Sequence, residues 1–198
     1  MTRIIAGAAG GRRLATPAGA RTRPTTDRVR EAVFSAMASW AGTSGGDAAS
    51  HLINTAFLDL FAGSGAVALE AASRGASPVW AVESDRGAAA IIRRNADATG
   101  LAVQVVARSV EAFLAAAPPT AFGIVWADPP YAFDADALDA LLAALAADPP
   151  ACWLAPESLV MVERSSRERA PRWPAALEVL PARVYGETSV YVARKGGA

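Results

Sequence analysis

The spacing of apolar positions changes along the chain, and its first part differs from the rest. Residues 3–14 contain two short apolar segments on either side of Gly10-Gly11, which predicts a small two-stranded arm. A helix is then predicted to begin at Thr26 or Asp27, since both residue types cap helices. Its apolar side chains recur every three or four residues, which predicts one buried face: Val29, Val33, Met37 and Trp40.

A polar, glycine-rich loop follows this helix. Its sequence is GTSGGDAASH, residues 42–51, and the helical periodicity stops where it begins. We interpret the loop as a boundary between an N-terminal extension, residues 1–40, and a main domain, residues 52–195.

The main domain alternates between short apolar runs and alanine-rich segments of helical length. The runs are AFLDLF, PVWAVE, VQVVA, FGIVWA and SLVMVE, and the helices are predicted at 66–74, 86–99, 109–117 and 134–147. This alternation predicts right-handed βαβ units and a parallel sheet covered on both faces. The tail segments LEVLPARVYG and TSVYVARK predict an antiparallel hairpin at the sheet edge. The expected fold is therefore α/β and Rossmann-like: a mostly parallel seven-stranded sheet, an antiparallel C-terminal hairpin and a small N-terminal hairpin and helix.

Composition narrows the chemistry that this fold can support. Of 198 residues, 53% are hydrophobic, yet no apolar run reaches the roughly 18 residues of a membrane span, so no membrane association is expected. Cys152 and His51 are the only residues of their kinds. A disulfide, a His/Cys metal cluster and a histidine-based triad are therefore not expected, and the cytoplasm is the expected location. The chemistry must depend on carboxylates, backbone groups or a bound cofactor.

Charge is unevenly distributed along a chain that is neutral overall. Residues 1–30 hold seven arginines and one acid, for +6, and the remaining residues hold 12 basic and 18 acidic side chains, for −6. A basic arm on an acidic body is typical of a protein that binds a polyanion. It is equally compatible with a solvated arm that maintains solubility.

Three predicted strands end in residues that suit a nucleotide-like cofactor, and such strand ends meet at one edge of a parallel sheet. After the first strand, Gly63 and Gly65 permit a tight turn, and the next helix points its N-terminus at the same space. After the second strand, Glu83 can accept hydrogen bonds from both hydroxyls of a ribose. After the third, a serine and the following amide can reach the adenine. The candidate cofactor residues are Asp59, Phe61, Ala62, Gly63, Ser64, Gly65, Glu83, Ser84, Ser109 and Val110.

Asp59 distinguishes between two cofactors. A pyrophosphate gains nothing from its negative charge, whereas the ammonium of an amino-acid moiety does. The third glycine of the dinucleotide fingerprint G-x-G-x-x-G is also missing. The combination favours S-adenosylmethionine (SAM) over NAD. The simpler alternative is that Asp59 caps a turn and Glu83 is a solvent-facing residue at a strand end.

The fourth strand ends in Asp128-Pro129-Pro130-Tyr131. Neither proline has an N–H, and each residue before a proline is held extended, so the segment forms a rigid rim of hydrogen-bond acceptors. Such a rim suits a planar exocyclic amine, which presents two N–H bonds. Two acceptors would direct the lone pair of the amine at a sulfonium methyl group. Asp128 or water can take the proton, so no histidine is required, and positioning is expected to contribute more than proton transfer.

Tyr131 completes the motif. Reaching an amine on a base means unstacking that base at roughly a few kcal/mol, and stacking on an aromatic ring returns about 1–3 kcal/mol. A base already in a loop is therefore the preferred substrate. The alternative is that the tetrapeptide is a simple turn and Tyr131 a core residue.

With these residues, the chain resembles class I SAM-dependent methyltransferases of exocyclic amines, and more narrowly the RsmD family. The similarity is carried by RIIAGAAGGRRL, RPTTDRVREAVFSAM, LDLFAGSGAVALEAASRGA and the DPPY motif, from Arg3 to about Tyr191. It implies methyl transfer from SAM to N2 of one guanine in the 16S ribosomal RNA of the small subunit. It also implies an assembled particle as substrate, in which ribosomal proteins help to present the loop.

The resemblance implies roles for individual residues. Asp128, Pro129, Pro130 and Tyr131 would hold the guanine and form the catalytic set. Arginines of the arm would contact RNA or cover the cofactor: Arg3, Arg12, Arg13, Arg21, Arg23, Arg28 and Arg30. The sequence departs from the pattern at Ser109, where many such enzymes have an acid or asparagine, and in using arginine where lysines are expected.

Three other hypotheses remain open from sequence. The DPPY motif alone is shared with adenine-N6 methyltransferases of nucleic acids. A nucleic-acid-binding protein that no longer catalyses is a second alternative, although it would not need the acceptor rim. An NAD-dependent oxidoreductase is the third, and it lacks the tyrosine–lysine pair or histidine that would donate its proton.

Overall fold

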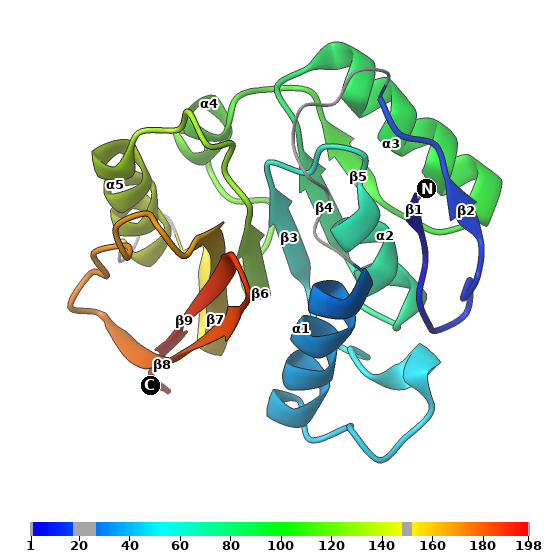
Figure 1. Ribbon diagram of the computed structural model, residues 1–198, viewed down its shortest axis with the longest axis horizontal. Coiled ribbons are helices and arrows are strands. Elements are labelled where there is room, and N and C mark those ends of the chain that lie inside the picture. Colours follow the sequence, from blue (N-terminus) through cyan, green and yellow to red (C-terminus); the bar gives the residue numbers. More distant parts are fainter. Residues whose placement is uncertain (1, 18–26, 148–151, 198) are drawn as a thin grey trace.

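The computed structural model describes residues 2–17, 27–147 and 152–197. One seven-stranded sheet has the order β5-β4-β3-β6-β7-β9-β8, and β1 and β2 form a separate hairpin (Figure 1). The parallel strands are β3 (Phe57–Leu60), β4 (Val79–Val82), β5 (Gln104–Val106), β6 (Phe122–Ala127) and β7 (Leu154–Ser165). The last strand, β9 (Thr188–Lys195), lies antiparallel between β7 and the edge strand β8 (Leu177–Tyr185). The predicted mostly parallel sheet with an antiparallel C-terminal hairpin is confirmed.

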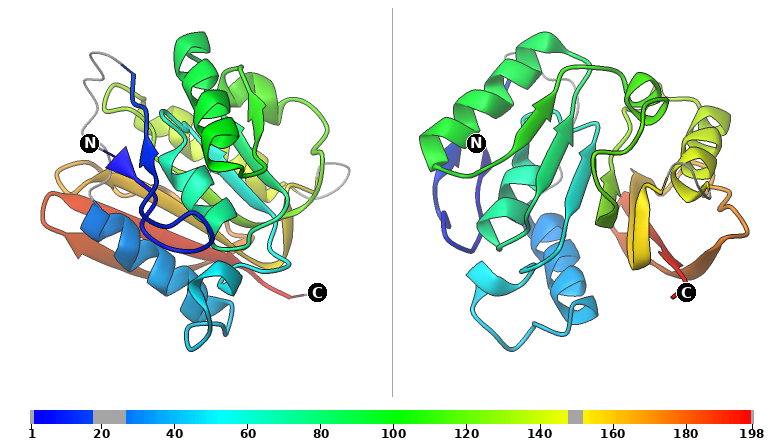
Figure 2. Two further views of the ribbon diagram at one scale, coloured as in Figure 1. Left: turned by 90° about the vertical axis from the view of Figure 1, so that its right-hand side faces the viewer. Right: turned by 180° about the vertical axis from the view of Figure 1, so that it is seen from behind.

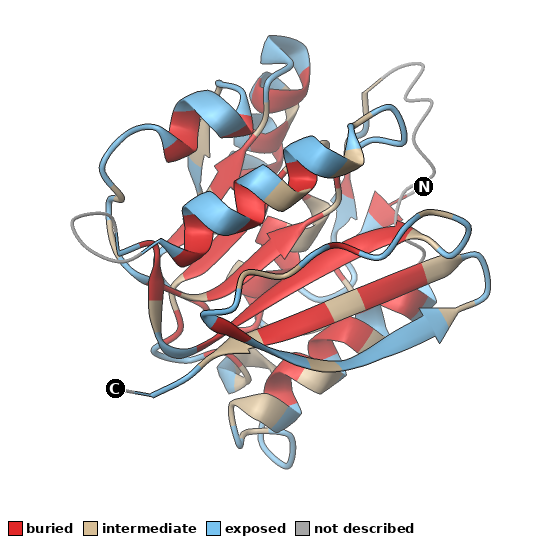
Figure 3. Ribbon diagram, turned by 90° about the vertical axis from the view of Figure 1, so that its left-hand side faces the viewer, coloured by how far each residue is buried: buried red, intermediate tan, exposed pale blue. Residues whose placement is uncertain are grey.

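Helices cover both faces of the sheet (Figure 2). One face packs against α4 (Val110–Leu114) and α5 (Ala135–Ala146). The other face packs against α1 (Asp27–Trp40), α2 (Ala66–Ser73) and α3 (Arg86–Thr99). Figure 3 shows that the central strands are buried, whereas the edge strand β8 is mostly exposed. Among the described residues, no helix is long and apolar enough to span a bilayer.

Helix α1 belongs to the core of the sheet. Val29, Val33 and Met37 are buried as the periodicity predicts, and Phe34 stacks on Phe57 of β3 with ring centroids 6.3 Å apart. The predicted cap at Thr26 lies outside the described residues. The predicted boundary after residue 40 therefore separates segments that share one hydrophobic core, and the RNA-binding role of residues 1–40 stays a prediction.

The hairpin of β1 (Thr2–Arg3) and β2 (Arg13–Leu14) is docked on α2 and α3. Glu70 of α2 is fully buried and accepts hydrogen bonds from the backbone N–H groups of Ile5 and Ala6 at 2.6 and 3.1 Å. A Cβ atom at Gly7, where φ is +84°, would lie 2.0 Å from the Ser73 carbonyl oxygen. Glycine is required here because the hairpin loop passes directly over the C-terminal end of α2.

Candidate active site

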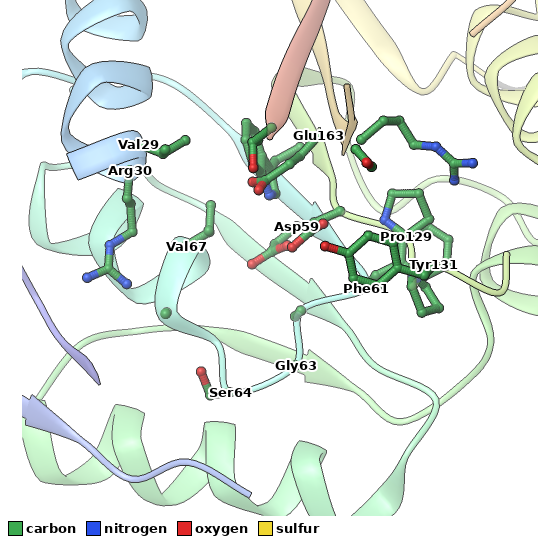
Figure 4. A pocket seen from close by; sticks show the side chains of 18 of the residues that line it. Val29, Arg30, Asp59, Phe61, Gly63, Ser64, Val67, Pro129, Tyr131 and Glu163 are labelled. Carbon is green, nitrogen blue, oxygen red and sulfur yellow. The ribbon is translucent and has the colours of Figure 1, made fainter. Parts of the chain in front are cut away.

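A cavity of about 920 Å³ opens at the carboxyl ends of β3, β4, β6 and β7 (Figure 4). Its walls come from segments far apart in the chain: the loop after β3, the start of α1, the DPPY segment and the β8–β9 turn. The carboxyl edge of an open α/β sheet is where ligands bind. Most of the predicted strand-end residues therefore meet at one cavity. Gly65, Ser109 and Val110 do not line it.

The glycine loop between β3 and α2 requires left-handed backbone at three positions. Phe61, Gly63 and Gly65 have φ values of +66°, +55° and +77°. A Cβ atom at Gly63 would meet nothing within 4 Å, whereas one at Gly65 would lie 2.7 Å from Cγ2 of Ile92 in α3. Only Gly63 therefore leaves open space beside the backbone for a ligand, and Gly65 permits the loop to pack against α3. Phe61, Ala62, Gly63 and Ser64 line the cavity, and Gly65 does not.

Glu83 lies after β4 and holds the glycine loop. Its Oε2 accepts from the Gly63 N–H at 2.8 Å, and its Oε1 accepts from the Asp85 N–H at 2.8 Å and from the Ser84 hydroxyl at 3.4 Å. Each carboxylate oxygen has two lone pairs, so these bonds leave acceptor capacity toward the cavity that Glu83 and Ser84 line. One lone pair of Oε2 thus remains to accept a hydrogen bond from a ligand, while the carboxylate fixes the loop.

Asp59 both bonds to the start of α2 and lines the cavity. Its Oδ2 accepts from the Ala68 N–H at 3.0 Å, in the first turn of α2, and the residue also lines the cavity. The side chain is 2% exposed, and this burial raises its pKa to about 8. Its bond from Ala68 lowers the pKa, and the charge of Glu83 raises it. A cation in the cavity would stabilise the ionised form.

The DPPY segment leaves β6 at the floor of the cavity. Burial raises the pKa of Asp128 well above its ordinary value, the nearby carboxylates of Glu163 and Asp59 raise it further, and Arg164 opposes them. Pro129 is buried, and the Pro130 carbonyl accepts from the Phe133 N–H at 2.8 Å, which closes the turn. The Pro130 carbonyl is therefore used within the turn, and Asp128 and Pro129 both line the cavity.

Tyr131 stands on the cavity rim. Its exposed fraction is 66%, which makes it one of the most exposed large hydrophobic side chains among the described residues. Behind it, Phe133 makes an edge-to-face contact with Phe61, with ring centroids 5.0 Å apart, and so braces the DPPY turn against the glycine loop. An exposed aromatic ring on a braced turn is suited to stacking on a planar ligand.

Ser109 and Val110 do not line the cavity. Ser109 caps α4, because its hydroxyl accepts from the Ala112 N–H at 3.3 Å, and Val110 is a core residue. Their contact with adenine stays a prediction that this geometry does not support.

The predicted RNA-binding arginines separate into three groups. Arg3, Arg12, Arg13 and Arg28 are exposed, and Arg28 also lines the cavity. Arg30 is only 2% exposed, donates to the Arg3 carbonyl and pairs with Asp27 at 3.0 Å, so it joins α1 to the hairpin. Arg21 and Arg23 lie outside the described residues. Within the exposed group, Arg12 donates to the Ala98 carbonyl at 3.0 Å and Arg3 pairs with Asp27 at 3.5 Å. The RNA-binding role of these arginines stays a prediction.

Several residues in and around the cavity were not predicted from the sequence. Glu163 lines the cavity from within β7, where it directly follows the apolar run Leu159–Val162. Thr16 and Pro17 of the arm form part of the wall. Asn95 of α3 joins this arm to the glycine loop, because its side chain bonds both backbone groups of Ala15 at 2.9 Å and donates to the Ser64 carbonyl at 3.1 Å. No sequence pattern indicated those contacts.

The described residues contain no group of three or more histidine, cysteine, aspartate or glutamate side chains placed to hold a metal ion. The cavity brings together the glycine loop after β3, the Glu83 carboxylate after β4 and the DPPY segment after β6. Fold and cavity together define a Rossmann-like class I methyltransferase.

Comparison with known proteins gives the family. The model of a family described as Conserved hypothetical protein 95 matches residues 2–194. Ribosomal RNA small subunit methyltransferase D of Escherichia coli K12 is 34% identical over 188 residues, covering 94% of this chain and 86% of that protein. The chain belongs to this family, the RsmD family.

Two solved structures agree along almost the whole length. The Escherichia coli yhhF protein has a TM-score of 0.81 and 30% identity, covering 99% of this chain and 98% of that chain. A hypothetical protein of Thermus thermophilus has a TM-score of 0.78 and 34% identity, covering 97% and 98%. The N-terminal hairpin and the C-terminal strands are thus included in the similarity.

Proposed function

We propose that this protein transfers a methyl group from SAM to the exocyclic N2 amine of a guanine in 16S ribosomal RNA, in the cytoplasm. One observation carries the proposal: the DPPY rim and the Asp59–Gly63–Glu83 side of the cavity face the same space. Family membership supports an RNA of the small ribosomal subunit as the substrate.

The residues present fit SAM. Open space beside Gly63 accommodates close approach of a ligand, Glu83 accepts ribose hydroxyls, and Asp59 pairs with the ammonium of the methionine moiety. The N-terminus of α2 adds a favourable partial charge for the methionine carboxylate. When bound, SAM supplies an electrophilic methyl group on its sulfonium.

The DPPY rim would hold and activate the amine. The Asp128 carboxylate and the Pro129 carbonyl accept its two N–H bonds, which localises the nitrogen lone pair and directs it into the cavity. In its ionised form the Asp128 carboxylate can take the proton that the amine loses, and burial and neighbouring carboxylates, which raise its pKa, favour keeping that proton on Asp128. Tyr131 stacks on the base and offsets about 1–3 kcal/mol of the cost of unstacking it.

The exposed arginines would position the RNA. Arg12 and Arg13 lie on the outer hairpin, and Arg28 lies at the cavity wall, so a strand bound along them leads toward the DPPY rim. Replacing Arg12 and Arg13 with alanine should weaken binding and flatten its salt dependence by about one to two in the slope of log K against log salt. Unchanged binding across a salt series would support a role in solubility instead.

The activity is tested with methyl-labelled SAM and small subunits from cells that lack this modification. The wild-type protein should label one guanine of 16S RNA at N2. Asp128→Asn should lower turnover by at least the roughly hundredfold expected for a lost general base, while binding of S-adenosylhomocysteine stays unchanged. Asp136→Asn, an exposed acid on α5, is the matched control. Label in adenine and none in guanine would refute the proposal.

A further inference from the structure

Glu163 lies next to Asp128 at the carboxyl edge of the sheet. In the register of β6 and β7, Ala127 is opposite Val162, so Asp128 and Glu163 are the next residues on adjacent parallel strands. Residues opposite each other in parallel strands point to the same face. Asp59 is opposite Trp126, two residues before Asp128, and belongs to that face as well. Three carboxylates on β3, β6 and β7 therefore face one cavity.

The sheet order assigns these acids to different parts of a ligand. Asp59 is on β3 and Glu163 is on β7, with β6 between them. At about 4.8 Å per strand, Glu163 is roughly 10 Å from the Asp59 strand and adjoins the DPPY rim. Figure 4 shows Glu163 with Asp59, Pro129 and Tyr131 around the cavity. Glu163 therefore lies near the DPPY rim, where the base is proposed to bind, and away from Glu83.

Glu163 is buried beside a second carboxylate, that of Asp128. Glu163 is 8% exposed, and its charge raises the pKa of Asp128. Two buried carboxylates repel each other, so the site gains from a ligand that donates hydrogen bonds to both.

Guanine presents such donors side by side. Its N2 amine adjoins N1–H, so two neighbouring positions on one edge donate. Adenine has an acceptor at N1 next to its amine, and a carboxylate there would meet a lone pair. We propose that Glu163 accepts the N1–H of the target guanine and so selects guanine over adenine. This inference rests on the proposed function, in which Asp128 holds the N2 amine.

The test distinguishes recognition of the N1–H group from recognition of the 2-amine. 2-Aminopurine keeps the 2-amine and has an acceptor at N1. Small subunits are reconstituted with 16S RNA carrying guanine or 2-aminopurine at the methylated position, and kcat/KM is measured for each. The wild-type enzyme should prefer guanine by about 10- to 100-fold, the range expected for one specific hydrogen-bonding contact.

Glu163→Gln should reduce that preference at least tenfold, because a carboxamide can donate to N1 of 2-aminopurine and can also accept from guanine. Glu168→Gln, an acid that lines the same cavity and pairs with Arg164 at 2.8 Å, should keep the wild-type ratio. Thermal shift with S-adenosylhomocysteine establishes that each variant is folded and binds cofactor.

Two results are distinguishable. If Glu163→Gln slows both substrates equally and leaves the ratio unchanged, Glu163 has a structural role and the inference is wrong, while N2 methylation stands. If the wild-type enzyme does not methylate the guanine-containing subunits, the proposed function fails and the inference fails with it.

Discussion

The protonation of Asp59 predicts that cofactor affinity depends on pH. Burial raises its pKa to about 8, so below that pH the unliganded protein holds a proton there. The ammonium of the methionine moiety needs the ionised carboxylate. Binding must therefore release a proton, and affinity should rise as pH rises through the pKa.

The expected size follows from the pKa. If only the ionised form binds, its fraction grows from about 1% at pH 6 to about half at pH 8, which is roughly a fiftyfold gain in affinity. Titration calorimetry with S-adenosylhomocysteine measures this gain. Repeating each titration in buffers of different ionisation enthalpy counts the proton released, which should be close to one at pH 6.

Two controls show whether the pH dependence of affinity comes from Asp59. Methylthioadenosine keeps the adenosine and lacks the amino-acid group, so its affinity should not change across this range through Asp59. Asp59→Asn should remove the pH dependence for S-adenosylhomocysteine and lower its affinity at pH 8. Equal pH dependence for both ligands, or a slope that persists in Asp59→Asn, would refute this reasoning.

Three positions in and beside the glycine loop give further predictions. Asn95→Ala should lower affinity for S-adenosylhomocysteine by roughly tenfold in calorimetry, because the arm and the glycine loop lose their shared hydrogen bonds. Thr99→Ala is the control: this residue lies one turn along and its hydroxyl is bonded only within α3, so the affinity should change little. Gly65→Ala should cost about 2 kcal/mol or more in urea unfolding, because φ is +77° and its Cβ would meet Ile92. Gly63→Ala should cost less stability, since its Cβ meets nothing within 4 Å, and should reduce cofactor binding more. Reversed effects at the two glycines would contradict the assignment of Gly63 to the ligand.

The sequence predicted the fold, and it predicted which strand-end residues would lie together, because both depend on local pattern. Buried strands followed by helices specify a parallel sheet, and polar residues at strand ends then lie at one edge. Asp59, Glu83 and Asp128 were predicted in this way, and all three line the cavity. Glu163 also follows an apolar run, but it lies within β7 and reaches the cavity because β7 pairs with β6, which no local pattern specifies.

The other differences between the roles predicted for residues and their observed contacts arise from tertiary packing. Arg30 lies four and seven residues before Phe34 and Met37, on the buried face of α1, so the periodicity of this helix indicated its burial, and its RNA-binding role stays a prediction. Ser109 precedes α4 in the position of a cap, and its hydroxyl is used there. The role of Asn95 depends on three segments meeting, which sequence spacing does not reveal.

The central claim is methylation of guanine N2 in 16S RNA by the DPPY rim. Mass spectrometric mapping of 16S RNA from cells lacking the protein tests it most directly. One guanine should lose its N2 methyl group, and a plasmid carrying the wild-type gene should restore it, while Asp128→Asn should not. A complete set of N2-methylguanines in the deleted strain, or restoration by Asp128→Asn, would contradict the account.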